Sequence, residues 1–195
     1  PDGRHIRYED VRALKKILHT EFNIEGNPEP SFRDLVMEVV PDQVTLVPDG
    51  HDAITSNSGW DTIRNANFLS QMCTLFHSAG IRVSIFIDPN PLMAEGAARC
   101  GADRVELYTA AYAKNFASDP QKAIAPYLET ALAARRCGLG LNAGHDLNLD
   151  NLEYLLNTIN WIDEVSIGHA LICDALYMGL EKTVQAYLEK TKSNI

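Results

Sequence analysis

The sequence contains few cysteines, and their spacing excludes the common cysteine-based sites. Neither a CxxC pair nor a Cys/His cluster at zinc-ligand spacing is present among the 195 residues. We therefore expect no metal site of this kind. Widely spaced cysteines indicate reduced, buried thiols of a cytoplasmic protein. The four are Cys73, Cys100, Cys137 and Cys173.

Positive charge and long apolar runs are also scarce. The chain has 17 Lys and Arg against 26 Asp and Glu, a formal net charge of -9. A protein that follows a nucleic-acid backbone needs a basic face, so nucleic-acid partners are not expected. No apolar run approaches the roughly 20 residues of a membrane span, and no signal-peptide pattern is visible. With 46% apolar residues, residues 1–195 are expected to form one soluble domain with a large core.

Short β-rich runs alternate regularly with longer amphipathic segments. The β-rich runs predict six strands, at residues 22–25, 43–47, 81–87, 104–108, 138–142 and 164–167. The amphipathic segments predict helices near residues 9–19, 31–40, 61–79, 90–100, 120–137, 148–158 and 170–190. No linker rich in Pro, Gly or Ser divides the chain, so the pattern indicates an α/β fold built from repeated βα units.

Several helix ends are marked by capping residues. Gly80, Gly101 and Gly138 each lie between a predicted helix and the next strand, where a left-handed residue is favoured. Ser31 and Asn148 are the expected N-caps of the helices that follow them. The same turn therefore recurs in several of the repeated units.

The spacing of the strands favours a closed barrel over an open sheet. One βα unit takes about 28 residues, close to the roughly 31 residues per unit of an eight-unit barrel of about 250 residues. An open doubly wound sheet usually has a Gly-rich turn after its first strand, and that turn is missing. We therefore expect a TIM-type (β/α)8 barrel, of which this chain holds about six βα units and a leading helix.

Polar residues follow nearly every predicted strand. A closed barrel gathers all the carboxyl ends of its strands around one mouth, so these side chains are expected to meet there. They are Glu25, Asp49, Asp88, Glu106 with Tyr108, residues 142–145, and Gly168 with His169.

Two of these strand ends carry a histidine beside a glycine. His145 follows Gly144 in a turn and is placed to carry protons, although a histidine that caps the next helix is an open alternative. Gly168 and His169 lead from a strand directly into a helix, whose N-terminus can bind phosphate even in an acidic protein. The alternative there is a tight turn with an incidental histidine.

Two carboxylates and one long loop complete the candidate site. Burial of Glu25 or Glu106 among apolar strands would raise its pKa and suit it to acid/base catalysis. Each could instead be a structural partner of Arg or Asn. The polar loop 48–59 is typical of a lid, in which Thr55 offers a hydroxyl group to a phosphate, or it is a simple surface loop.

Taken in order, the motifs resemble one family, the pyridoxine 5′-phosphate synthases of vitamin B6 biosynthesis. The similarity extends over the whole chain in the same order and spacing, which makes it more specific than any single motif. The matching segments are Arg4-His5-Ile6, Asn23-Ile24-Glu25, Leu46-Val47-Pro48 with Thr55, residues 83–88, residues 105–109, Asn142-Ala143-Gly144-His145 and Ile167-Gly168-His169-Ala170.

The resemblance implies an activity and a set of ligands. Family members condense 1-deoxy-D-xylulose 5-phosphate with 3-amino-2-oxopropyl phosphate to pyridoxine 5′-phosphate, phosphate and water. Neither a metal nor an organic cofactor is implied. A homo-oligomer is implied, because octamers occur in the family.

The resemblance also implies roles for single residues. Glu25 matches an acid/base residue, His145 the proton donor, and Glu106 a carboxylate important for activity. The resemblance assigns contacts with the two phosphorylated substrates to a second group of residues. His5 and Thr55 match contacts to deoxyxylulose phosphate, and Gly168, His169 and Asp146 match contacts to aminooxopropyl phosphate. The family often has Gly where this chain has Asp146, so a backbone contact is expected there.

One part of the family pattern is missing. The family begins with a strand carrying an Asn-x-Asp-His-type motif, a helix, and a second strand ending in His-x-Arg, and none of these precedes Pro1. We therefore expect the chain to be an N-terminally truncated barrel that by itself lacks part of the active site.

Two other functions are compatible with the residues. The chain could be another phosphate-binding barrel enzyme of the aldolase or isomerase type, but no lysine ends any predicted strand, which disfavours a Schiff-base aldolase. It could also be a non-catalytic barrel that binds a phosphorylated ligand, in which case Glu25 and His145 would be replaceable.

Overall fold

A single parallel β-sheet forms the centre of the computed structural model, which describes residues 3, 5–50 and 56–192. Its six strands pair in chain order, each with its neighbour in the sequence. All six predicted strands are confirmed, with ends shifted by a few residues at most. They are β1 (Asn23–Gly26), β2 (Gln43–Leu46), β3 (Arg82–Ile87), β4 (Arg104–Tyr108), β5 (Gly140–Gly144) and β6 (Glu164–Ser166).

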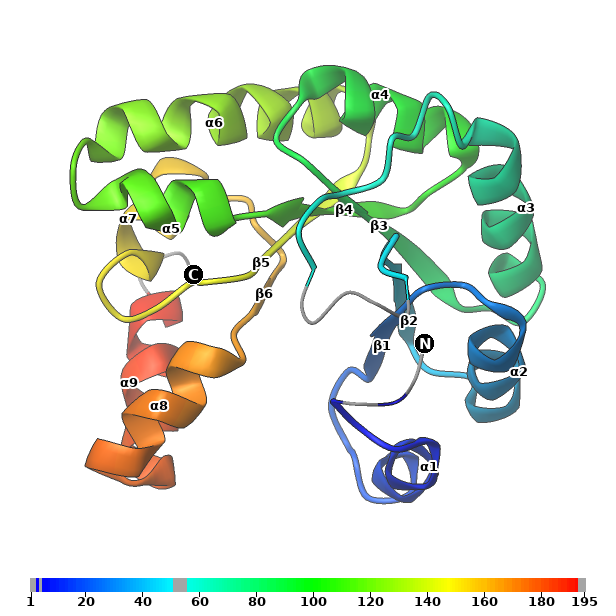
Figure 1. Cartoon of the computed structure of the whole chain (residues 1–195), viewed down its shortest axis with the longest axis horizontal. Helices are drawn as coiled ribbons and strands as arrows, with labels where there is room; N and C mark the ends of the chain where they lie inside the picture. Colours follow the sequence, from blue (N-terminus) through cyan, green and yellow to red (C-terminus); the bar gives the residue numbers. More distant parts are fainter. Residues whose placement is uncertain (1–2, 4, 51–55, 193–195) are drawn as a thin grey trace.

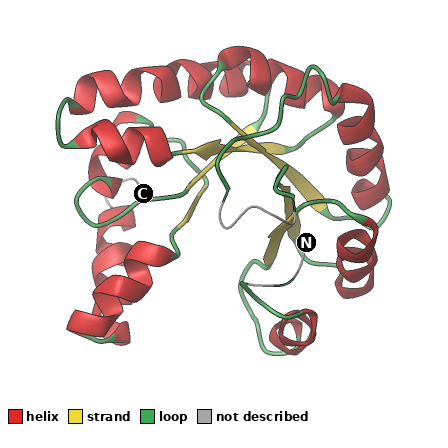
Figure 2. Cartoon of the chain, viewed as in Figure 1, coloured by secondary structure: helices red, strands yellow, loops and turns green. Residues whose placement is uncertain are grey.

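The sheet is curled into a half-barrel, with helices along its outer side (Figure 1, Figure 2). Strands β1 and β6 lie at its two ends and, within the described residues, do not pair with each other. The predicted α/β fold of repeated parallel βα units is thus confirmed. The predicted closure into a barrel is not observed in the described part of the chain.

Nine helices lie within the described residues. Most match a predicted helix, and their bounds are α1 (Tyr8–Lys15), α2 (Pro30–Val39), α3 (Ala66–His77), α4 (Pro91–Cys100), α5 (Ala110–Phe116), α6 (Pro120–Arg136), α7 (Leu152–Thr158), α8 (His169–Met178) and α9 (Leu180–Thr191).

Four helical predictions need correction. The single helix expected at 170–190 is two helices, because Gly179 adopts φ 82° between α8 and α9. Helix α5 was not predicted. Ser31 is not an N-cap, since Pro30 already occupies the first turn of α2. Asn148 instead accepts hydrogen bonds from the backbone of residues 150 and 151, and α7 begins only at Leu152.

The glycines predicted to end helices have the expected geometry. Gly80, Gly101 and Gly138 have φ angles of 74°, 89° and 75°, in the region that residues with a Cβ atom rarely adopt. Each reverses the chain from a helix on the outside into the next strand.

The two faces of the sheet differ in chemistry. Residues alternate along each strand, so that Val105 and Leu107 join the apolar core while Glu106 between them faces the concave side. Fully buried polar residues share that concave face. They include Gln43, Thr45, Ser84, Glu106 and Asn142.

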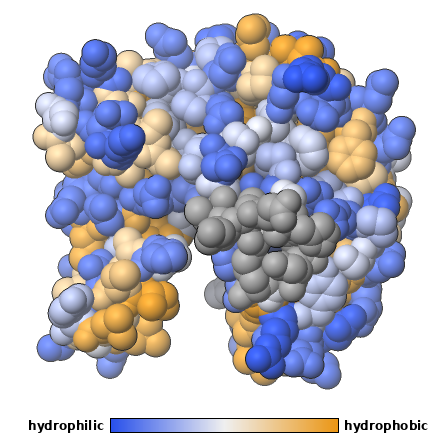
Figure 3. Space-filling model, viewed as in Figure 1, coloured by the Kyte–Doolittle hydropathy of each residue, from blue (hydrophilic) through white to orange (hydrophobic). Residues whose placement is uncertain are grey.

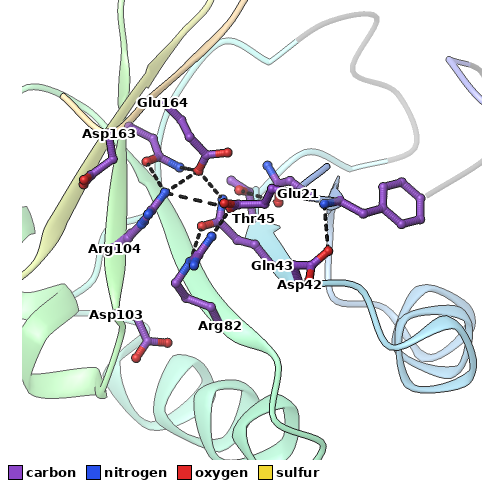
Figure 4. Close-up of polar contacts among 12 residues, drawn as sticks. Glu21, Asp42, Gln43, Thr45, Arg82, Asp103, Arg104, Asp163 and Glu164 are labelled. Carbon is purple, nitrogen blue, oxygen red and sulfur yellow. Dashed lines mark hydrogen bonds and ion pairs between the residues drawn. The ribbon is translucent and has the colours of Figure 1, made fainter. Parts of the chain in front are cut away.

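An ionic network crosses the concave side at the amino ends of the strands (Figure 4). Glu164 of β6 accepts hydrogen bonds from Arg104 of β4, Asn142 of β5 and Gln43 of β2. Arg82 of β3 donates to Gln43 and pairs with Glu21. Because the network joins β2 to β6, it ties the two halves of the curled sheet together.

The cysteine prediction is confirmed in part. All four thiols are free, and Cys73 and Cys100 are buried in the core. Cys137 and Cys173 are exposed, contrary to expectation. Cys137 lies where α6 ends at the surface, and Cys173 belongs to α8, which has no buried residue.

Helix α8 and the start of α9 expose large apolar side chains, visible as an apolar patch at one end of the half-barrel (Figure 3). The residues are Ile172, Leu176, Tyr177, Met178 and Leu180. Among the described residues, each helix is too short or too polar to traverse a lipid bilayer.

Candidate active site

Glu106 is the most enclosed of the predicted catalytic residues. Its side chain is fully buried, and neither carboxyl oxygen makes a hydrogen bond of standard geometry within the described residues. Burial raises the pKa of Glu106 well above the ordinary value, and the nearby charges of Glu25 and Glu164 raise it further. The Ser166 side chain is close enough to oppose this shift. Burial and the nearby charges both favour the uncharged form of the carboxyl group, which can donate a proton.

Glu25 lies at the end of β1, close enough to Glu106 for their charges to interact. The residue is exposed to solvent, although many protein atoms lie around its carboxyl group. Loss of hydration raises the pKa of Glu25 to about 7, and the negative charge of Asp49 adds to the effect. Near neutral pH this carboxyl group can therefore both accept and release a proton.

His145 follows β5, and its ring packs against two aromatic side chains. The ring centroid lies 5.0 Å from that of Phe86 and 5.1 Å from that of Tyr108, the latter in an edge-on arrangement. Partial burial lowers the pKa of His145, whereas the charges of Asp146 and Asp49 act in the opposite direction. Burial thus favours the neutral imidazole, while the nearby carboxylates favour its protonated form.

His5 and Asp146 are both close enough to His145 to influence its pKa. A charge on His5 lowers the pKa of His145. The predicted substrate contact of His5 stays a prediction. Asp146 is exposed, has φ 55°, and also acts on the pKa of Tyr108. The structure therefore brings together Glu25, Glu106, His145, His5 and Asp146.

Gly168 and His169 stand at the start of α8, shortly after β6. Gly168 precedes the first turn, and a Cβ atom there would meet nothing within 4 Å, so its backbone is open to a ligand. His169 is exposed at the first position of the helix. Because β6 pairs in parallel with β5, the helix N-terminus and the turn of His145 follow the same end of the sheet.

The loop after β2 lies against the carboxyl ends of β2 and β3. Trp60 donates its backbone N–H to Phe86 O at 2.8 Å and its ring N–H to Leu46 O at 3.1 Å. A Cβ atom at Gly59 would come within 2.3 Å of Asp88 N, so only glycine allows this close approach. Thr55, predicted to contact a phosphate, lies outside the described residues.

No group of three His, Cys, Asp or Glu side chains in the described part of the chain is arranged to hold a metal ion.

Comparison with known proteins identifies the family of the chain. The family model of the pyridoxal phosphate biosynthesis protein PdxJ matches residues 1–193. The chain belongs to the PdxJ family. It is 62% identical, over 98% of its length and 81% of the relative's, to the pyridoxine 5′-phosphate synthase of Cytophaga hutchinsonii. It is 60% identical, over 96% of its length and 79% of the relative's, to the protein of the same name from Bacteroides thetaiotaomicron.

A solved structure outside the PdxJ family shares the fold. A Pediococcus acidilactici chain, described as a refolded lactate oxidase, superposes with a TM-score of 0.60 over 94% of this chain and 58% of its own. The two sequences are only 13% identical, so the likeness concerns the fold alone.

Sequence reasoning missed several residues of this PdxJ-family site. Phe86 and Glu164 were not singled out. Phe86 of β3 lies in register with Glu106 of β4, and Glu164 of β6 lies in register with Asn142 of β5. Thr109, directly after β4, was noted only as part of a motif. Counting every second residue of each strand would have placed the first two on the concave face.

Proposed function

We propose that this chain carries out the reaction of a pyridoxine 5′-phosphate synthase. It condenses 1-deoxy-D-xylulose 5-phosphate with 3-amino-2-oxopropyl phosphate to pyridoxine 5′-phosphate, releasing phosphate and water. Joining an amine to a ketone and closing an aromatic ring require repeated proton transfers, which carboxylates and histidines perform without a cofactor.

The observation that carries the proposal is the meeting of three proton-transfer groups with different pKa shifts. Glu25, with a pKa of about 7, removes protons from the substrate and returns them. Glu106, whose burial favours the uncharged form, stabilises developing negative charge. His145 delivers protons to departing oxygen atoms, and Asp146 beside it supports its protonated form.

Two phosphate groups must be bound in a protein of net charge -9. Local groups must therefore supply the attraction, since the overall field is unfavourable. The N-terminus of α8, with the open backbone at Gly168 and the side chain of His169, holds the phosphate of 3-amino-2-oxopropyl phosphate. His5 and Thr55 hold the phosphate of 1-deoxy-D-xylulose 5-phosphate. The backbone of Asp146 contributes to the binding of 3-amino-2-oxopropyl phosphate.

The active form is a closed (β/α)8 barrel in the cytoplasm. Strands β1 and β6 each have one unpaired edge within the described residues, and two further strands between them would complete the eight. The protein is a homo-oligomer, and the exposed apolar side chains of α8 offer one surface for assembly. Light scattering of the purified full-length protein would test this, and a monomer would contradict it.

The decisive experiment incubates full-length protein with both substrates and follows the absorbance of the pyridoxine ring. Glu25→Gln and His145→Asn should each lower kcat by at least about 100-fold. Glu181→Gln and His19→Asn, exposed and distant from the site, are the matched controls and should match the wild-type rate. Binding of both phosphorylated substrates without ring formation would instead support a non-catalytic barrel. Turnover of one substrate alone would support another barrel enzyme of the aldolase or isomerase type.

A further inference from the structure

We propose that Thr109 is the positioning residue of the site, whose side-chain hydroxyl group holds the turn of His145 in place relative to Glu106. The inference rests on the proposed function, because it assumes that these two side chains act in one reaction. It concerns a residue that touches neither the substrate nor the reacting atoms.

The hydroxyl group of Thr109 does not cap the helix that begins after it. Thr109 is the N-cap of α5, where threonine commonly accepts a hydrogen bond from the first turn of its own helix, but no such bond is made. The side chain is fully buried and points instead to the end of β5. There it lies within hydrogen-bond distance of Gly144 O, at 2.7 Å, and of His145 O.

One hydroxyl group has one proton to donate, so the two carbonyl groups compete for it. The backbone N–H of Thr109 already donates to Gly144 O at 2.9 Å. Because that N–H already binds Gly144 O, the hydroxyl proton can be donated to His145 O without leaving Gly144 O unpaired. The main chain and the side chain of one residue thus fix two consecutive peptide groups of the turn.

This turn needs such support because its backbone is strained. His145 and Asp146 have φ angles of 80° and 55°, a region that residues with side chains rarely adopt, and they do so consecutively. The side-chain amide of Asn151 donates to Asp146 O at 3.2 Å. Thr109 and Asn151 together therefore hold the carbonyl groups of Gly144, His145 and Asp146.

The location of Thr109 connects the two catalytic side chains. It follows β4 directly, three residues after Glu106, and its hydrogen bonds reach the turn that carries His145. With the turn held, the imidazole ring stays against Phe86 and Tyr108. Without the hydroxyl group, the backbone can relax toward ordinary φ values and carry the ring away from the carboxyl group of Glu106.

The first test measures activity in the full-length protein. Thr109→Val keeps the shape but removes the donor, and should lower kcat by about 10- to 100-fold with little change in KM, as expected for a small displacement of a catalytic group. Thr109→Ser keeps the donor and should restore most of the activity. Thr130→Val is the matched control, because Thr130 is also fully buried and donates to a carbonyl group, Pro126 O at 2.8 Å, within α6. It should leave kcat unchanged.

The second test does not depend on activity. The imidazole resonances of His145, assigned with His145→Asn, are followed by NMR over a pH titration. Thr109→Val should change their chemical shifts, through lost ring-current effects, and should move the titration midpoint toward that of an exposed histidine. Thr109→Ser and Thr130→Val should leave both unchanged.

The two tests separate the possible failures. If the wild-type protein forms no product, the proposed function fails, while the NMR comparison still decides whether Thr109 positions His145. If Thr109→Val keeps the wild-type kcat and the wild-type imidazole titration, the positioning role is overturned. Equal losses of kcat in Thr109→Val and Thr130→Val would also overturn it, because general destabilisation would then explain both.

Discussion

The carboxyl group of Glu106 occupies the space that a side chain at Gly144 would need. A Cβ atom at Gly144 would lie 2.2 Å from Glu106 Oε1 and 3.1 Å from Ser166 Cβ. The φ angle of Gly144 is not in the left-handed region, so its backbone conformation does not require glycine. The requirement comes instead from the side chain of Glu106 on the neighbouring strand. It is the absence of a side chain on β5 that lets the carboxyl group of β4 lie across the concave face.

Replacement of this glycine should disturb the site directly. Gly144→Ala is expected to displace Glu106, to lower the free energy of unfolding by about 1–3 kcal/mol through overpacking, and to lower kcat sharply. Urea unfolding and the ring-formation assay measure the two effects. When Glu106→Ala is already present, Gly144→Ala should lower the free energy of unfolding much less than it does in the wild-type protein. An equal loss in the two backgrounds would contradict the contact between the two residues.

The pKa of Glu25 predicts a pH-dependent contribution to stability. Its value of about 7, compared with an ordinary 4.5, means that the folded chain keeps a proton that the unfolded chain releases. The free energy of unfolding therefore falls as the pH rises from about 4.5 to 7. The glutamine of Glu25→Gln cannot ionise. The difference in melting temperature, variant minus wild type, should therefore be more positive at pH 8 than at pH 4. A difference in melting temperature between Glu25→Gln and wild type that does not change with pH would count against the shifted pKa.

Asp146 should influence the charge of the neighbouring histidine. Its carboxylate favours the protonated form of His145, so Asp146→Asn is expected to lower the pKa of His145 further. Asparagine also tolerates the φ angle of 55° at this position, so the turn should keep its shape. NMR titration of His145 measures the shift. Asp150→Asn, on the exposed side of the same loop, is the control and should leave the midpoint where it is.

The network at the amino ends of the strands should contribute to stability rather than to chemistry. Glu164→Ala removes the acceptor shared by Arg104, Asn142 and Gln43, and should cost about 2 kcal/mol in the free energy of unfolding. Denaturant unfolding measures this loss. Glu38→Ala breaks the exposed pair with Arg12 and should cost less, because water already surrounds both charges. A loss for Glu164→Ala no larger than for Glu38→Ala would show that the network does not tie the sheet together.

Much of the fold followed from local patterns. The six strands and the glycine turns after α3, α4 and α6 were predicted correctly, because burial of alternating residues and left-handed helix ends depend on near neighbours in sequence. The predicted helix over 170–190 was wrong at Gly179, where one φ angle separates α8 from α9. The exposure of Cys137 and Cys173 was also missed, since it depends on what covers the ends of α6 and α8.

The sequence by itself determined the repeated βα order, the parallel sheet that this order requires, and the identity of Glu25, Glu106 and His145 as candidate acid/base groups. Tertiary structure alone decided their environments. Burial raises the pKa of Glu106, and loss of hydration brings the pKa of Glu25 to about 7. Phe86 and Tyr108 pack against the ring of His145. Desolvation and charge–charge interactions depend on distances between residues remote in sequence, and folding alone sets those distances.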